Sequence, residues 1–293
     1  MRSITSNSIR GYLHKPRYKY HSFKDGQIQT SFTESKTIYY GWELEIERRN
    51  TSTNLNEIAH QIIIDSNKYL YCKHDGSIGG KGGFEVVSHP ATFNVIKNMD
   101  LENYVLKHRD KMKGFYTSDC GIHIHMNRNS FTDFHLFKFV LFFNQEQEFT
   151  KAISQRVGRR RGGDDFYYCK LDSTLANFIK KDSAKKIKDI KNGIISSKRQ
   201  SKKYVPDVNR NGQYDDRYLA INVQNSATIE IRLFKSNMDE VSFRKNIEFL
   251  DCLYWFTKEN RIEDFNVENF VKFANTNKKD YSNLLKFVNR ISY

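Results

Sequence analysis

Three short segments of this sequence alternate apolar and ionisable residues with a period of two, and they constrain the fold more than any other feature. They are Gly41–Glu47, Gly121–Met126 and Thr228–Phe234, with the sequences GWELEIE, GIHIHM and TIEIRLF. Such alternation predicts half-buried β-strands with one apolar and one polar face. The polar face of most such strands carries Ser, Thr, Lys and Glu toward water. Here it carries carboxylates, imidazoles and a guanidinium, so we expect one shared charged face.

The other segments favour a mixed α+β fold. Apolar residues near helical spacing predict helices over residues 51–69, 91–113, 131–154 and 239–258, and further strands are expected over 84–88 and 217–223. The order of these elements favours mostly antiparallel connections and therefore the α+β class. Residues 1–36 are basic and show no period, so we interpret them as an N-terminal extension. We expect residues 37–293 to form one domain.

The composition is that of a globular protein with 293 residues, enough for one large domain or two small ones. No apolar run reaches the roughly 18 residues that a membrane span needs. The first residues lack the apolar stretch of a signal peptide, so a cytoplasmic location is expected. The four cysteines, Cys72, Cys120, Cys169 and Cys252, have neither CxxC nor zinc-ribbon spacing and are interpreted as reduced thiols.

Positive charge is concentrated in three parts of the chain. The net charge is +14, and the excess lies in the N-terminal extension, in Arg156–Arg161 and in Lys180–Lys203. Basic segments attract polyanions, so nucleic acid is one candidate partner. The phosphates of ATP, an acidic substrate, or a need for solubility alone would also explain the charge.

The strand at 41–47 places Glu43, Glu45 and Glu47 on one face, because two residues of a strand advance about 7 Å. A solvated edge strand paired with lysines would show the same triplet. His123 and His125 share a face for the same reason. An HxH pair is often structural, but two neutral imidazoles on one strand can also point into a metal site.

Four further charged residues extend this set. Glu85 lies in an otherwise apolar strand, where an unpaired carboxylate would be costly. Asp75 belongs to a DGS turn, and Glu230 and Arg232 share a strand face either as a simple ion pair or as a site for metal and phosphate. Because carboxylates outnumber imidazoles, the set suits Mg²⁺ or Mn²⁺ better than zinc.

Taken in order, the segments GWELEIE, DGS, GFEVVS, CGIHIHM, a basic loop before YYC, and TIEIRLF resemble the amidoligase branch of the carboxylate–amine ligases. That superfamily includes glutamine synthetase and glutamate–cysteine ligase. The resemblance extends from about Tyr39 to Phe256, and the order and spacing of the motifs carry it. It implies a curved, mainly antiparallel sheet with helices on its convex side. The concave face would hold divalent ions between ATP and the substrate.

The resemblance also implies a role for each of the candidate site residues. The metal ligands would be Glu43, Glu45, Glu85, His123 and Glu230. His125 would lie near the transferred phosphate, and Arg232 would stabilise its charge. The nucleotide-binding loop would include Arg156, Arg159, Arg160 and Arg161. Glu47 or Asp75 would be the base that deprotonates the amine.

The implied reaction is ATP- and Mg²⁺-dependent amide formation through an acyl phosphate. The partners would be ATP and a carboxylate and amine substrate pair, which could include a peptide or a protein. Two other functions stay open at this point. One is a catalytically silent member of the family that binds nucleic acid or has a structural role. The other is a metal-dependent hydrolase or nuclease, which would act without ATP. No motif indicates the oligomeric state.

Overall fold

The computed structural model describes residues 7–78, 82–117, 119–156, 169, 171, 219–223 and 225–291. The chain divides into two compact units. The first comprises Met1–Asn127 and Phe234–Arg244, and the second comprises Arg128–Leu233 and Lys245–Tyr293. Each unit is described by itself. Among the described residues, no helix combines the length and hydrophobicity that a membrane span requires.

The first unit is built on a mostly antiparallel sheet. Its strands follow the order β1 (Ile9–Arg10), β5 (Leu70–Lys73), β6 (Gly83–Ser88), β4 (Tyr40–Arg48) and β8 (Gly121–Asn127). The short β7 (Met112–Lys113) also pairs with β4. The β1–β5 pair is parallel, whereas β5–β6, β6–β4 and β4–β8 are antiparallel. A separate hairpin joins β2 (Tyr20–Lys24) to β3 (Gln27–Ser31).

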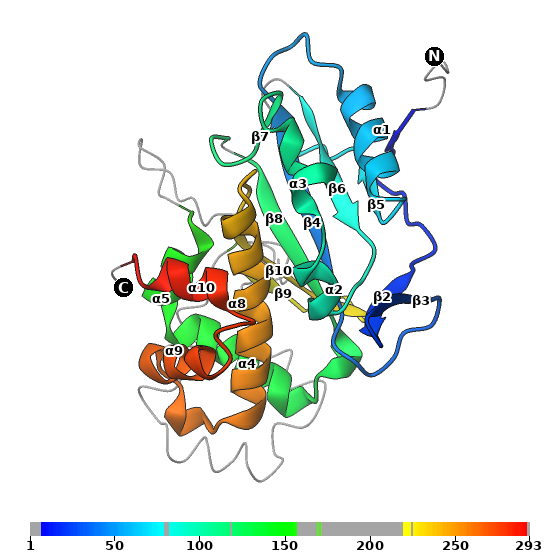
Figure 1. The fold of residues 1–293 in the computed structure, drawn as a ribbon. Helices are drawn as coiled ribbons and strands as arrows, with labels where there is room; N and C mark the ends of the chain where they lie inside the picture. Colours follow the sequence, from blue (N-terminus) through cyan, green and yellow to red (C-terminus); the bar gives the residue numbers. More distant parts are fainter. Residues whose placement is uncertain are drawn as a thin grey trace, which may run out of the picture. The chain divides into compact units, whose positions relative to one another are not determined.

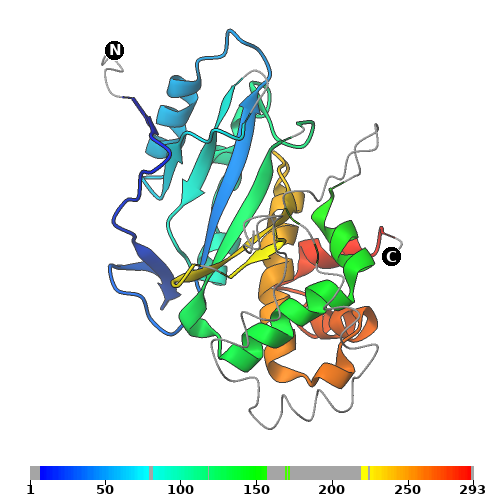
Figure 2. The same cartoon turned by 180° about the vertical axis from the view of Figure 1, so that it is seen from behind.

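One face of this sheet is apolar because of the alternation in the strands. In β4, Trp42, Leu44 and Ile46 are at most 1 % exposed. Helix α1 (Leu55–Asp65) begins at Asn54, whose side chain accepts a hydrogen bond from the Glu57 N–H, and it packs against β5 on this face. Figure 1 shows α2 (Phe93–Lys97) and α3 (Leu101–Tyr104) in front of the strands, and Figure 2 shows the strands from the opposite side.

The second unit is mainly helical. It contains η2 (Arg128–Ser130), α4 (Asp133–Gln145), α5 (Gln147–Ser154), η5 (Ile262–Asp264), α9 (Val267–Thr276) and α10 (Ser282–Val288), together with the short strand β9 (Ile221–Asn222). Its core is rich in phenylalanine, and ring contacts join Phe142, Phe256 and Phe270. The boundary between the units falls inside β10 (Thr228–Lys235) and inside α8 (Glu240–Glu259), so both units share these two elements.

Most of the predicted elements are confirmed. The α+β class is correct, and the strands expected at 41–47, 84–88, 121–126 and 228–234 are β4, β6, β8 and β10. The curvature of the sheet and the packing of helices on its convex side stay predictions. So does the division into an extension at 1–36 and one domain at 37–293, although β1, β2 and β3 lie within that extension.

Two helix predictions are wrong in detail. The single helix expected at 91–113 is replaced by α2, α3, η1 (Leu106–His108) and β7. The side chain of Asp100 accepts a hydrogen bond from the Asn103 N–H and so begins a new helix in mid-segment. The helix expected at 131–154 ends and restarts at Glu146, which gives α4 and α5.

Candidate active site

The polar side chains of β4, β6 and β8 meet on one face of the first unit's sheet. The register places Glu45 opposite Glu85 on β6 and places Glu43 opposite His123 on β8. On the other face, Cys72 of β5 contacts α1 through the Ala59 carbonyl. The charged side chains therefore lie on the opposite face from α1. The predicted shared face of Glu43, Glu45 and Glu47 is confirmed, as is that of His123 and His125.

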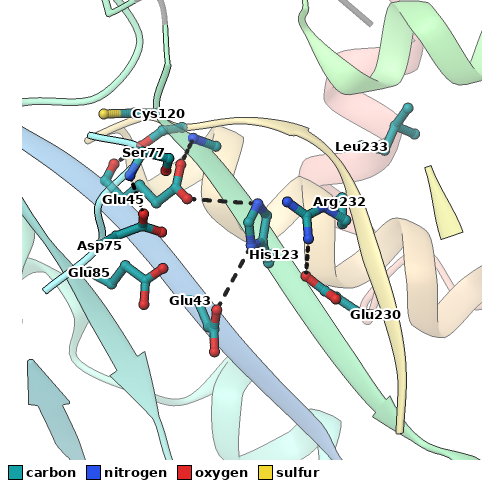
Figure 3. A network of polar contacts seen from close by, with 12 residues as sticks. Glu43, Glu45, Asp75, Ser77, Glu85, Cys120, His123, Glu230, Arg232 and Leu233 are labelled. Atoms are coloured by element: carbon teal, nitrogen blue, oxygen red, sulfur yellow. Dashed lines mark hydrogen bonds and ion pairs between the residues drawn. The ribbon is translucent and has the colours of Figure 1, made fainter. Parts of the chain in front are cut away.

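Three carboxyl groups form the centre of this face. Each of Glu45, Asp75 and Glu85 offers an oxygen atom, and these atoms lie within 4.8 Å of one another. Figure 3 shows the three side chains turned toward one another. Glu45 is 3 % exposed and Glu85 is 2 % exposed. We call this group the carboxylate trio.

Backbone groups hold two members of the carboxylate trio in place. The Ser77 N–H donates to Oδ1 of Asp75 over 2.5 Å, which is a hydrogen bond within the DGS turn. The Gly121 N–H, at the start of β8, donates to Oε2 of Glu45 over 2.5 Å. Charge-assisted bonds of this kind fix the orientation of a buried carboxylate.

The pKa values of Asp75 and Glu85 are shifted in opposite directions. Burial, the hydrogen bond with Asp75 and the nearby charge of Glu43 together raise the pKa of Glu85 to about 10. Burial also raises the pKa of Asp75, but hydrogen bonds from Glu85 and Ser77 outweigh it, and the net shift is downward. One proton between two carboxyl groups is the expected state when no cation offsets their charge. Since all three members of the trio offer hard oxygen donors, they fit Mg²⁺ or Mn²⁺.

The two histidines of β8 lie beside Glu43. The ring nitrogens of His123 lie 3.8 Å from Oε2 of Glu43 and 3.8 Å from Oε1 of Glu45 (Figure 3). Nε2 of His125 lies 3.6 Å from Oε1 of Glu43. Burial alone would raise the pKa of Glu43, but the two neighbouring imidazoles and the charge of Lys73 hold it well below its usual value. Glu43 is therefore ionised, whereas Glu85 is protonated.

Two lysines complete the face. Lys113 of β7 lies opposite Glu47 and pairs with its carboxylate at 3.5 Å. Lys73 ends β5 and contacts both Glu43 and Glu85. Neither lysine was predicted from the sequence. The burial of the four residues of β5 alternates in the structure and places Lys73 on this face, but the sequence alone gave no signal for it.

In the second unit, Glu230 and Arg232 lie on the polar face of β10, while Ile229, Ile231 and Leu233 are buried on the other. Nη1 of Arg232 donates to Oε1 of Glu230 over 3.1 Å, and the Asn222 side chain donates to Oε2 over 3.0 Å. The predicted shared face of Glu230 and Arg232 is confirmed. Their participation in one site with the carboxylate trio stays a prediction.

The predicted nucleotide-binding arginines lie mostly outside the described residues, which hold only one of the four. Arg156 directs its guanidinium at the backbone of β10, with Nε donating to the Leu233 carbonyl over 2.8 Å and Nη2 to the Arg232 carbonyl over 3.3 Å. Arg159, Arg160 and Arg161 lie outside the described part, as does the lysine-rich segment 180–203. Their binding of nucleotide or of nucleic acid stays a prediction.

Comparison with known proteins gives a family match and structural matches that cover most of the chain. The model of a family described as "Putative amidoligase enzyme" matches residues 25–254. Among solved structures, one similar chain comes from the crystal structure of the complex between prokaryotic ubiquitin-like protein Pup and its ligase PafA. The match has a TM-score of 0.35 and 11 % sequence identity, and it covers 86 % of this chain but only 58 % of that one. No curated protein matches.

Proposed function

The chain belongs to the amidoligase family, and we propose that it is an ATP- and Mg²⁺-dependent carboxylate–amine ligase. The observation that carries this proposal is the carboxylate trio of Glu45, Asp75 and Glu85, which lies within the matched region. Three carboxyl groups whose oxygen atoms lie within 4.8 Å of one another, two of them buried, are suited to hold a divalent cation. Phosphoryl transfer from ATP requires such a cation.

The proposed chemistry follows from the poor reactivity of carboxylates. Transfer of the γ-phosphoryl group of ATP to a substrate carboxylate gives an acyl phosphate and ADP. Attack by an amine on the acyl carbon then breaks the bond to the phosphate oxygen. The products are an amide and inorganic phosphate, and the amine nitrogen loses a proton.

The charged side chains on this face of the first unit each have a proposed part in this reaction. Glu45, Asp75 and Glu85, with His123 beside them, would hold the cation, which supplies Lewis-acid stabilisation of the phosphate charge when bound. Glu43 orients both histidines, and His125 is proposed to face the transferred phosphoryl group. If the carboxylate of Asp75 binds the cation, it cannot also be the base that takes the proton from the amine. Glu47, which is ion-paired with Lys113, is then the candidate base.

We propose that Glu230 and Arg232 of β10 take part in the same reaction. The guanidinium of Arg232 would neutralise phosphate charge, because its planar arrangement of N–H donors matches the oxygens of a phosphate group. Glu230 would be a further oxygen ligand, and its contact with Asn222 holds it in position.

A calorimetric titration with ATP, in buffers with and without Mg²⁺, tests the proposal. Wild-type protein should bind ATP only when Mg²⁺ is present. Glu45→Gln keeps the size and the acceptor for the Gly121 N–H but removes one charge, and it should weaken Mg²⁺-dependent binding by about 10- to 100-fold. The control is Glu102→Gln, which makes the same change at a half-exposed side chain paired with Arg109. The proposal is wrong if folded wild-type protein shows no Mg²⁺-dependent ATP binding, or if Glu45→Gln binds as wild type does.

A further inference from the structure

Lys73 lies between two groups of carboxylates on the charged face. It is the last residue of β5 and pairs in register with Glu85. Its Nζ is 3.0 Å from Oε2 of Glu85 and 3.3 Å from Oε1 of Glu43, and its side chain is only 14 % exposed. Glu85 belongs to the carboxylate trio, whereas Glu43 contacts the two histidines. The ammonium group therefore bridges the trio and the histidine cluster.

The charge of this ammonium group is secured by its surroundings. Its Nζ lies 3.3 Å from a carboxylate oxygen of Glu43 and 3.0 Å from an oxygen of Glu85, and a lysine is cationic at neutral pH. Lys73 is thus a fixed positive charge among buried carboxyl groups. Without it, Glu43 and the ionised members of the trio would repel one another.

A fixed positive charge at this place also restricts where a second cation can bind. It occupies one carboxylate oxygen of Glu43 and one of Glu85, and it repels any divalent ion that approaches between them. Oxygen atoms of Glu45, Asp75 and Glu85 still lie within 4.8 Å of one another, so a cation can bind among these three carboxyl groups.

We propose that Lys73 determines the occupancy of the site: it confines a divalent cation to Glu45, Asp75 and Glu85 and keeps Glu43 as the partner of His123 and His125. Lys73 is then a positioning residue that acts through Glu43 and Glu85. This inference rests on the proposed metal site. It adds that the number and the affinity of bound cations are set by a lysine and not by the carboxylates alone.

The test is a calorimetric titration with MnCl₂ alone on wild-type protein, Lys73→Met and Lys73→Arg. Wild type should bind one Mn²⁺ in the absence of nucleotide. Lys73→Met should bind a second Mn²⁺ between Glu43 and Glu85, and its first site should bind on the order of tenfold more tightly, because a neighbouring like charge is gone. Lys73→Arg keeps the charge and should keep the wild-type stoichiometry.

Thermal melts of the same proteins give a readout that does not depend on activity. In EDTA, Lys73→Met should melt below wild type, because Glu43 loses its buried counter-ion. Mn²⁺ should then raise the melting temperature of the variant more than that of wild type. The matched control is Lys113→Met, which removes a lysine paired with Glu47 on the same face but outside the carboxylate trio. It should keep one Mn²⁺ at wild-type affinity.

Two different failures can be told apart. If wild type binds Mn²⁺ and Lys73→Met matches it in stoichiometry, affinity and metal-free melting, the role of Lys73 is overturned and the metal site stands. The role is equally overturned if Lys113→Met reproduces every effect of Lys73→Met. If neither wild type nor Lys73→Met binds Mn²⁺, the proposed metal site itself fails, and the inference fails with it.

Discussion

A carboxyl group inside an apolar strand is costly unless it is protonated or paired, and Glu85 satisfies both conditions. It is 2 % exposed, burial and the neighbouring Asp75 raise its pKa to about 10, and Nζ of Lys73 lies 3.0 Å from its Oε2. Its pKa is raised far above the ordinary value of 4.5, so the side chain is neutral at pH 7 in the metal-free protein.

The Glu85→Gln variant should therefore tolerate high pH better than wild type in metal-free buffer. The unfolded chain loses the Glu85 proton near pH 4.5, whereas the folded chain keeps it to about pH 10. The contribution of Glu85 to stability is thus complete below pH 4.5 and declines as the pH rises toward 10. Glutamine has no proton to lose. From pH 5 to 8, the free energy of unfolding of Glu85→Gln should therefore rise relative to that of wild type by up to about 1.4 kcal/mol per pH unit.

Urea unfolding in EDTA at pH 5 and pH 8 measures this difference. Glu85→Ala is the comparison, because it removes a buried partner that Asp75 and Lys73 share and should be less stable than Glu85→Gln at both pH values. Parallel pH dependence of wild type and Glu85→Gln would contradict the raised pKa of Glu85.

Single residues differ in how far the sequence predicts them. Glu85 could be identified because a carboxylate in an apolar strand needs an explanation. Lys73 could not, since it precedes the DGS turn and its contacts depend on the β5–β6 register, which local sequence does not determine. Asp75 was predicted as a base. The proximity of its carboxylate to Glu45 and Glu85, which are distant in sequence, makes it a candidate ligand.

At the scale of elements, prediction succeeded where one strand face is buried. β4, β6 and β8 alternate strongly because their apolar faces fill the core of the first unit. The hairpin of β2 and β3 gave no such signal, because every residue of β3 is exposed. The positions of the site residues along the strands were therefore predictable, but the backbone pairing that brings β5 beside β6 was not.

Close packing between β6 and β4 makes Gly83 irreplaceable. A Cβ atom at Gly83 would lie 2.1 Å from the Ile46 carbonyl oxygen and 3.0 Å from Cα of Glu47, both on the β4 backbone. Gly83→Ala should push β6 away from β4 and lower the free energy of unfolding by about 1–3 kcal/mol or more. It should also weaken Mn²⁺ binding, because Glu85 lies two residues further along the same strand.

Urea unfolding and MnCl₂ titration of Gly83→Ala measure the two effects. The control is Gly11→Ala, where a Cβ atom would meet nothing within 4 Å. Equal stability of Gly83→Ala and Gly11→Ala would show that β6 can move without cost, and the close approach would then have no part in placing Glu85.

At the scale of the whole molecule, two shared elements connect the units through the chain itself. The boundary crosses β10 between Leu233 and Phe234 and crosses α8 between Arg244 and Lys245. Phe243, in the first turn of α8, contacts Trp42 of β4 in the first unit, while the helix residues after Lys245 belong to the core of the second. Neither unit can unfold completely without breaking a strand and a helix that also belong to the other.

We therefore expect one cooperative unfolding transition, and the two tryptophans allow a direct test. Trp42 lies in the first unit and Trp255 in the second, and they are the only tryptophans of the chain. In Trp42→Phe, fluorescence reports on the second unit alone, while far-UV circular dichroism reports on the entire chain. The urea midpoints from the two signals should coincide, and the same should hold for Trp255→Phe. Separate midpoints within either variant would mean that the two units unfold independently. In that case α8 and β10 would be disrupted at the boundary while the core of one unit was still folded.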